Sequence, residues 1–217
     1  MTTTPNFRKP LAVSLVAAAL LAALPGCAPI VVGGAAVMTG VVATDRRSAG
    51  TQVDDQTIEV KAMNALPTAL EGYGHVSATS YNRLVLLIGE VPKPQLAAAA
   101  QQAMLKIDGV RSVVNDIIVA PDAGVSQISA DTLTTGKVKA AMIDAKGFPS
   151  GAVKVITERG IVYLLGIVTV AEAEQATEIT RGVSGVQKVV KVFEVVTPAE
   201  LQKLQPARGA PSTPPAN

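Results

Sequence analysis

The sequence predicts an α+β protein of two tandem αββαβ domains, each a three-stranded sheet with two helices on one face. The first observation behind this is an internal repeat: residues 83–91 match 160–168 at an offset of 77, and 108–114 match 184–190 at an offset of 76. The second is that each copy passes from helical spacing to two apolar runs, to helical spacing again and to a last apolar run. Because each helix has one apolar stripe, we expect both helices on the same face of the sheet.

The first helix is expected over 55–70 in one copy and over 132–145 in the other, with 60–62 aligned to 138–140. An acidic residue precedes each of these helices where an N-cap is preferred, and a glycine follows where a helix can end. These residues are Asp54 and Asp131, and Gly72 and Gly147.

A hairpin is expected next in each copy, over 75–81 and 84–91 and over 152–157 and 161–168. Only two residues separate the apolar runs, which indicates a tight turn. The turn residues are Asn82 and Arg83 in the first copy and Arg159 and Gly160 in the second.

Each copy is expected to close with a second helix, over 96–107 and 173–183, and a final strand, over 113–119 and 189–196. Glycine recurs at matching points, and we interpret it as a backbone requirement rather than a ligand site. Inside a strand it indicates a bulge or a close backbone approach, and after a helix it indicates a left-handed cap. The strand glycines are Gly89 and Gly166, and the cap glycines are Gly109 and Gly185.

The N-terminal segment has the order of a secretory signal peptide. Arg8 and Lys9 precede an apolar stretch over 11–24, and small residues lead into Cys27, the only cysteine of the chain. A cysteine in this position resembles a bacterial lipobox, in which the thiol is acylated and the cysteine becomes the new N-terminus. We therefore expect residues 1–26 to be removed and Cys27 to carry the lipid.

An uncleaved membrane anchor is the alternative, because apolar residues continue to about residue 44 and 11–44 is long enough to span a bilayer. Proline and glycine residues interrupt this stretch at Pro25, Pro29 and Gly33, among others. A lone cysteine that is simply buried in a core is a further alternative. Its position at the end of an apolar stretch favours lipidation.

The chain is therefore divided into a lipid-modified N-terminus, two domains and a tail. We expect the two domains to touch or nearly touch, because the linker is short, and each to fold as a unit of its own. The proline-rich tail has the composition of a disordered, partly extended segment. The expected segments are 1–26 signal peptide, 27–53 tether, 54–120 first domain, 121–130 linker, 131–197 second domain and 198–217 tail.

Composition argues against several functional classes. Removing 1–26 takes away two of the 19 basic residues, so 17 basic and 17 acidic residues remain, which disfavours nucleic-acid binding by bulk charge. His75 is the only histidine, and no G-x-S-x-G elbow, zinc-ligand cluster or phosphate-binding glycine loop is present. We therefore expect no catalytic residue, no metal site and no cofactor.

A candidate membrane-docking site lies at the start of the second domain. Residues 131–196 carry eight basic and seven acidic side chains, whereas residues 54–120 carry five and seven. Lysines surround apolar residues there, a combination suited to an anionic lipid surface. The candidate lipid-binding residues are Lys137, Lys139, Met142, Ile143, Lys146 and Phe148. The alternative is a solvated helix face with Met142 and Ile143 in the core.

The strand motif over 160–168 and its copy over 83–91 resemble the BON domain. The segment 44–59, TDRRSAGTQVDDQTIE, resembles the part that joins the lipidated cysteine to the first domain in dual-BON outer-membrane lipoproteins. This resemblance implies a non-enzymatic periplasmic module that is anchored to the outer membrane, binds anionic phospholipid through its second domain and supports membrane integrity. Ala28 after Cys27, where aspartate would favour inner-membrane retention, fits that location. An envelope scaffold that binds a protein partner through a sheet edge is the alternative.

Overall fold

The computed structural model describes residues 45–204. Cys27, the expected signal peptide and most of the expected tether and tail lie outside the described residues. The first part of the expected tail, Pro198–Leu204, is helix α6. The Thr197 N–H and hydroxyl donate to Glu200, and the Glu200 N–H donates to Thr197, so a capping box starts this helix.

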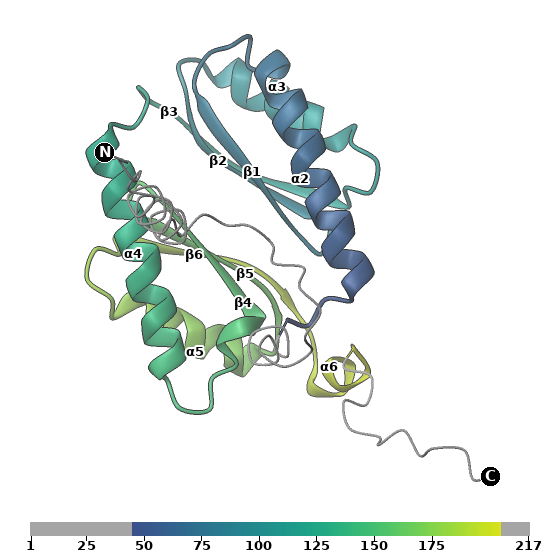
Figure 1. Ribbon diagram of the computed structural model, residues 1–217, viewed down its shortest axis with the longest axis vertical. Coiled ribbons are helices and arrows are strands. Elements are labelled where there is room, and N and C mark those ends of the chain that lie inside the picture. Colours follow the sequence, from purple (N-terminus) through teal and green to yellow (C-terminus); the bar gives the residue numbers. More distant parts are fainter. Residues whose placement is uncertain (1–44, 205–217) are drawn as a thin grey trace, which may run out of the picture. The chain divides into compact units, whose positions relative to one another are not determined.

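The first domain has the predicted order of elements, and helices α2 and α3 cover one face of its sheet (Figure 1). The sheet order is β1-β2-β3, with β1 antiparallel and β3 parallel to β2. The elements are α2 (Ala49–Ala69), β1 (His75–Tyr81), β2 (Leu84–Val91), α3 (Pro94–Leu105) and β3 (Ser112–Val119).

The second domain repeats this arrangement with α4 and α5 on one face of the sheet β4-β5-β6. A short 3₁₀ turn, η1, is added before β4. The elements are α4 (Val125–Asp144), η1 (Ser150–Ala152), β4 (Val153–Glu158), β5 (Ile161–Val168), α5 (Val170–Arg181) and β6 (Lys188–Val195). The predicted fold class is confirmed.

Helices α2 and α4 begin six or seven residues earlier than the sequence indicated. The N-cap of α2 is Ser48, whose hydroxyl accepts from the Thr51 N–H, and the N-cap of α4 is Gly124. The prediction that Asp54 and Asp131 cap these helices is therefore wrong, and residues 125–130 of the expected linker are helical. Both aspartates lie inside the helices instead, where Asp54 pairs with Arg83 and Asp131 accepts hydrogen bonds from the β4–β5 turn.

A buried aspartate on the first helix of each domain holds the hairpin turn of that domain. Asp55 accepts the N–H groups of Asn82 and Arg83 at 2.8 and 2.7 Å. Asp131 accepts those of Arg159 and Gly160 at 2.8 Å each. All four turn residues have positive φ, and a two-residue turn of this kind matches the twist of a hairpin. Each aspartate therefore fixes the rotation of its helix over the sheet.

The Asp55 carboxylate accepts further hydrogen bonds, from the Ser80 hydroxyl at 2.6 Å and from Arg47 at 2.8 Å. Burial alone would raise the pKa of this carboxyl group, but the bonds from Ser80, Arg83 and Arg47 outweigh burial and hold the pKa below its ordinary value. Asp55 is therefore a buried anion with a full set of donors.

The buried side of α2 matches that of α4 at an offset of 76. The expected alignment of 60–62 with 138–140, an offset of 78, is therefore wrong for these helices, although the strand offset of 77 is correct. The buried residues are Asp55, Ile58, Ala62 and Leu66 on α2, and Asp131, Thr134, Val138 and Met142 on α4.

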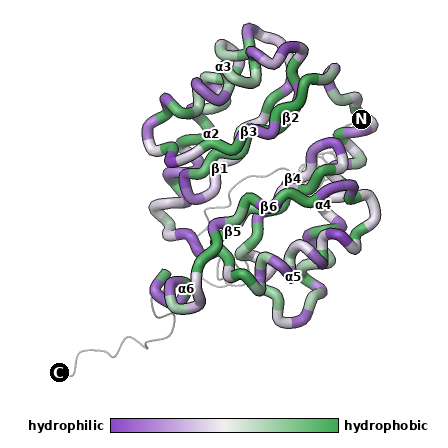
Figure 2. The backbone as a smooth tube through the Cα atoms, turned by 180° about the vertical axis from the view of Figure 1, so that it is seen from behind, coloured by the Kyte–Doolittle hydropathy of each residue, from purple (hydrophilic) through white to green (hydrophobic). Residues whose placement is uncertain are grey.

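The central strands β2 and β5 are buried on both faces. One face of each sheet packs under its two helices, and these two cores are separate clusters. The other faces contribute to a third cluster that contains residues of both domains, among them Leu86 and Ile88 of β2 and Tyr163 and Leu165 of β5. Figure 2 shows the result, since most of β2 and β5 is hydrophobic along its length instead of alternating.

Polar contacts between the domains surround this shared cluster. Glu194 on β6 accepts from Asn82 and Arg111 at 2.7 Å each, and the Tyr163 hydroxyl donates to Asp116 at 2.7 Å. The two domains thus share a core, which the expectation of two independent folding units did not include. An isolated domain would expose the apolar side of its central strand.

The residues before α2 also contact both domains. Arg46 donates to the Ile167 carbonyl and to both carboxylate oxygens of Glu172, at 2.6 to 2.8 Å. Arg47 pairs with Asp55, and its guanidinium lies over the Tyr81 ring at 4.2 Å from the centroid. The end of the expected tether is therefore a folded part of the protein.

Substituting Asp131 with alanine should lower the free energy of unfolding by about 3 kcal/mol, because two backbone N–H groups of the turn lose a charged acceptor. Asp54→Ala is the matched control, since its ion pair with Arg83 is half-exposed and contributes about 0.5 kcal/mol. Urea unfolding followed by circular dichroism measures both. Equal effects of the two substitutions would contradict the role of Asp131.

The Arg46–Glu172 pair should make stability pH-dependent in the acid range. The Arg46 guanidinium lowers the pKa of Glu172 from its ordinary 4.5 to about 2. A carboxyl group with a lowered pKa stabilises the fold above its ordinary value, and the contribution is lost as the pH falls through 4.5 toward 2. Wild type should therefore exceed Arg46→Gln in unfolding free energy at pH 7, and the difference should shrink steadily below pH 4.5. Arg181→Gln, which removes an exposed pair with Glu178, should show little difference at either pH.

Candidate functional site

Helix α4 carries four of the candidate lipid-binding residues, and its inner side is fixed by the second-domain core. Asp131 holds the β4–β5 turn, Val138 and Met142 are buried under the sheet, and the Thr134 hydroxyl donates to the Ala130 carbonyl inside the helix. These contacts leave the opposite side of α4 without a protein partner among residues 45–204. The composition of that outer side determines what the helix can bind.

The outer side of α4 is apolar from Leu133 to Ile143, whereas Ser129 is exposed on the same side in the first half of the helix. Leu133 is 66% exposed and Ile143 is 70% exposed, although both are large hydrophobic residues. Gly136 and Ala140 lie between them at spacings of three and four residues, so the four form one stripe. Val125 and Ile128, near the start of the helix, are also exposed.

Lysines stand beside this stripe. Lys139 is on the helix and Lys146 follows its end, and both are exposed. Lys137 is exposed too, and its Nζ donates to the Ser184 hydroxyl at 3.2 Å, a bond to the loop after α5. Lys154 is nearby in the sequence, but it is paired with Glu59 of the first domain at 3.0 Å. Three of the basic residues of this region are therefore available at the surface.

The structure places two candidate residues away from any surface. Met142 is 1% exposed and Phe148 is 8% exposed, and both belong to the second-domain core. The expectation that Phe148 enters the headgroup region is wrong, because its side chain packs beneath α4. The alternative interpretation placed both Met142 and Ile143 in the core. It is correct for Met142 and wrong for Ile143, which is exposed.

Leu133 is a residue that the sequence analysis missed. It lies ten residues before Ile143, nearly three full turns, so the two side chains share a face. The buried side of α4 includes Asp131 and Thr134, so apolar spacing does not distinguish its inner side from its outer side. Had Asp131 been recognised as a buried residue of α4, helical spacing would have placed Leu133 on the exposed side of the helix.

Helix α2 is the internal comparison. Its outer side also exposes apolar residues, Val53, Val60 and Met63. Its charges differ, because Asp54 pairs with Arg83 and Lys61 lies 3.9 Å from Asp108. The apolar stripe with several lysines beside it is a property of the second domain.

Residues 45–204 carry the features of neither a metal site nor a membrane-spanning helix. Within 45–204, no group of three or more His, Cys, Asp and Glu side chains is arranged to hold a metal ion. In the same range, no helix combines the length and the hydropathy that crossing a bilayer requires. His75 is exposed at the start of β1.

Most of the chain is similar to known proteins. The family model of the BON domain matches residues 54–121 and 130–197. The chain is 42% identical over 158 residues to the outer membrane lipoprotein DolP of Haemophilus influenzae, covering 72% of this chain and 81% of that protein.

Two further relatives are similar over a smaller share. The chain is 38% identical to the 21 kDa hemolysin of Actinobacillus pleuropneumoniae, covering 63% of this chain and 72% of that protein. It is 30% identical to osmotically-inducible protein Y of Escherichia coli, covering 61% and 68%. The two matched segments correspond to the two αββαβ units of the structure. The chain therefore belongs to the BON-domain family and contains two copies of the domain.

Proposed function

We propose that this protein is a lipid-anchored, non-enzymatic module of the outer membrane that faces the periplasm, binds phospholipid and supports membrane integrity. The second domain is the docking unit, and the anionic phospholipid surface is its partner. The observation that carries the proposal is the exposed apolar stripe of α4 with lysines beside it. The similarity to an outer membrane lipoprotein supports the location.

The outer side of α4 has the chemistry that an interfacial helix needs. Leu133 and Ile143 can enter the boundary between headgroups and acyl chains, and burying a side chain of this size contributes about 1.5–3 kcal/mol when it is complete. Lys137, Lys139 and Lys146 can meet lipid phosphates, each contributing about 1 kcal/mol near an anionic surface. These contributions suit reversible docking.

Docking of α4 would also strengthen the attachment that acylation of Cys27 provides. A single acyl chain holds a protein only marginally at a membrane, and stable attachment takes a second signal. The anchor also keeps the second domain close to the bilayer, so a weak docking face is engaged at high effective concentration. The two devices together would hold the folded domains against the lipid surface.

An envelope scaffold that binds a protein partner remains the second candidate function. Strand β1 is at the edge of the first sheet, and a sheet edge can accept another strand. Both candidates are binding functions and need no catalytic residue. Retention of liposome binding by the isolated folded part distinguishes them.

Liposome flotation of the fragment 45–217 tests the docking face. The variant with Lys137, Lys139 and Lys146 changed to Gln should lose about 3 kcal/mol of affinity for anionic liposomes, about a hundredfold, because three phosphate contacts are removed. Leu133→Ser and Ile143→Ser should each weaken binding without unfolding the protein, because both side chains are exposed.

Val60→Ser and Lys61→Gln on α2 are matched controls, since they change an exposed apolar residue and a lysine on the corresponding helix of the first domain. They should bind as wild type does. Wild-type affinity in the folded triple lysine variant would exclude this face from lipid docking.

Cys27→Ser tests the anchor in cells. The substitution removes the thiol that acylation requires, so the variant should retain its signal peptide and incorporate no palmitate analogue. Metabolic labelling followed by electrophoresis measures both properties. Equal labelling of variant and wild type would contradict lipidation at Cys27.

A further inference from the structure

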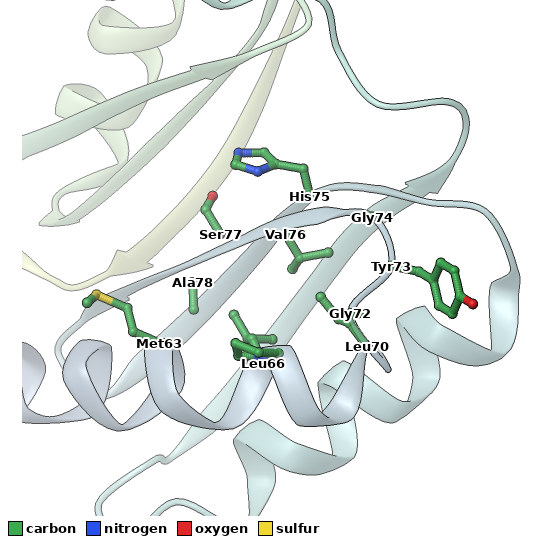
Figure 3. A pocket seen from close by; sticks show the side chains of 11 residues that line it. Met63, Leu66, Leu70, Gly72, Tyr73, Gly74, His75, Val76, Ser77 and Ala78 are labelled. Carbon is green, nitrogen blue, oxygen red and sulfur yellow. The ribbon is translucent and has the colours of Figure 1, made fainter.

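A hollow of about 460 Å³ lies between helix α2 and strand β1 of the first domain. Figure 3 shows Met63 and Leu66 on the helix side and Val76 and Ala78 on the strand side, with the side chains of Val76 and Ala78 directed toward the helix. Leu66 forms part of the floor and is buried, whereas Met63 at the mouth is 70% exposed. The lining is mostly apolar, and the α4 docking face contributes none of it.

The wall formed by β1 is a sheet edge with free backbone groups. The two-residue turn makes Tyr81 and Leu84 the closing hydrogen-bonded pair of the hairpin, so the backbone groups of alternate residues, Ser80, Ala78 and Val76, point away from β2. The bond from the Ser80 N–H to Glu59 at 2.9 Å confirms this direction. The outward N–H and C=O groups of Ala78 and Val76 border the hollow and can pair with an added strand.

The two domains differ at the corresponding point of the chain, directly after the first helix. Both domains have a glycine of positive φ followed by an aromatic residue after the first helix, Gly72-Tyr73 and Gly147-Phe148. Phe148 is turned into the core of its domain, and the chain continues through the extra turn η1 into β4. Tyr73 is 58% exposed and lies at the rim of the hollow. The second domain thus adds its aromatic side chain to the core, whereas the first domain leaves its aromatic side chain exposed beside a hollow.

We propose that the hollow between α2 and β1 binds an extended peptide of a partner protein, with one large apolar side chain in the hollow and its backbone paired to Val76 and Ala78. The groove is continuous with the domain interface, because His75 at its end also lines a hollow with Asp131 and Glu158 of the second domain. A peptide satisfies both the apolar space and the free strand edge, whereas an acyl chain would fill the space and leave the backbone groups unpaired. This inference rests on the second candidate function, for which it names a site and a class of ligand, and it does not depend on lipid docking.

The test uses the full-length chain in phosphatidylcholine nanodiscs and a defined probe. The probe is a fluorescein-labelled peptide with the sequence of residues 147–155, GFPSGAVKV, which offers an aromatic side chain followed by a strand. Its matched control has serine in place of phenylalanine. Fluorescence polarisation measures the affinity of both peptides.

The first variant is Met63→Glu, which places a charge at the mouth of the hollow and leaves the core intact. The second is Ala78→Pro, which removes an outward N–H without breaking the β1–β2 ladder. Val60→Glu is the control, because Val60 is an exposed residue of α2 that does not line the hollow. Thermal unfolding identifies any variant that has lost its fold.

We expect the phenylalanine peptide to bind wild type and the Val60→Glu variant alike, and to bind the Met63→Glu and Ala78→Pro variants about tenfold more weakly. The serine peptide should bind weakly to all four proteins. Absence of binding to wild type at about 1 mM peptide, or equal binding to a folded Met63→Glu variant, would overturn the proposal. Binding of a fluorescent fatty acid that Met63→Glu abolishes, without peptide binding, would overturn it in favour of an acyl-chain site.

Discussion

The burial of both faces of β2 and β5 is the constraint on which the rest of the structure depends. A three-stranded sheet with helices on one side leaves its other side to water, and there a central strand normally alternates apolar and polar residues. These strands carry apolar residues on both sides, so each sheet needs a second cover, and the other domain provides it. The two copies are therefore expected to fold together. The hydrogen bonds of Glu194, Asp116 and Arg46 to the opposite domain form because the shared core holds the two sheets side by side.

A covered sheet also determines which surfaces remain for binding. With both faces of each sheet used, the free surfaces of the described residues are the outer sides of the helices and the edges of the outer strands. Asp55 and Asp131 then fix how each first helix is rotated, because a carboxylate bonded to two turn N–H groups cannot rotate away without leaving them unpaired. The exposure of Leu133 and Ile143 thus follows from a hydrogen bond on the opposite side of α4.

The hairpins, the order of elements and the turns could be predicted from the sequence, because two-residue turns and strand glycines impose local requirements. Gly89 shows this well, since a Cβ there would lie 2.0 Å from the His75 carbonyl oxygen. The helix starts could not be predicted in the same way, because an aspartate that binds a distant turn resembles a cap. The exposure of the candidate docking residues could be predicted only in part, because buried Asp131 and Thr134 give α4 no clear apolar side. The shared core was indicated by consecutive apolar residues in β2 and β5, Leu84–Ile88 and 161–165, although Glu90 interrupts the apolar run of β2 near its end.

Duplication allows the two copies to diverge at matching positions while the constraint of the shared core is kept. The glycine-aromatic pair after the first helix shows such a divergence: Phe148 completes a core, whereas Tyr73 faces solvent beside an open hollow. The outer sides of α2 and α4 show another, since only the second carries several lysines beside its apolar stripe. Neither difference lies in the central strands β2 and β5, which form the shared core, so either surface can change without destabilising that core. The two copies thus expose different surfaces, an apolar helix face with lysines beside it in one and a strand edge beside a hollow in the other, and both share the core between the sheets.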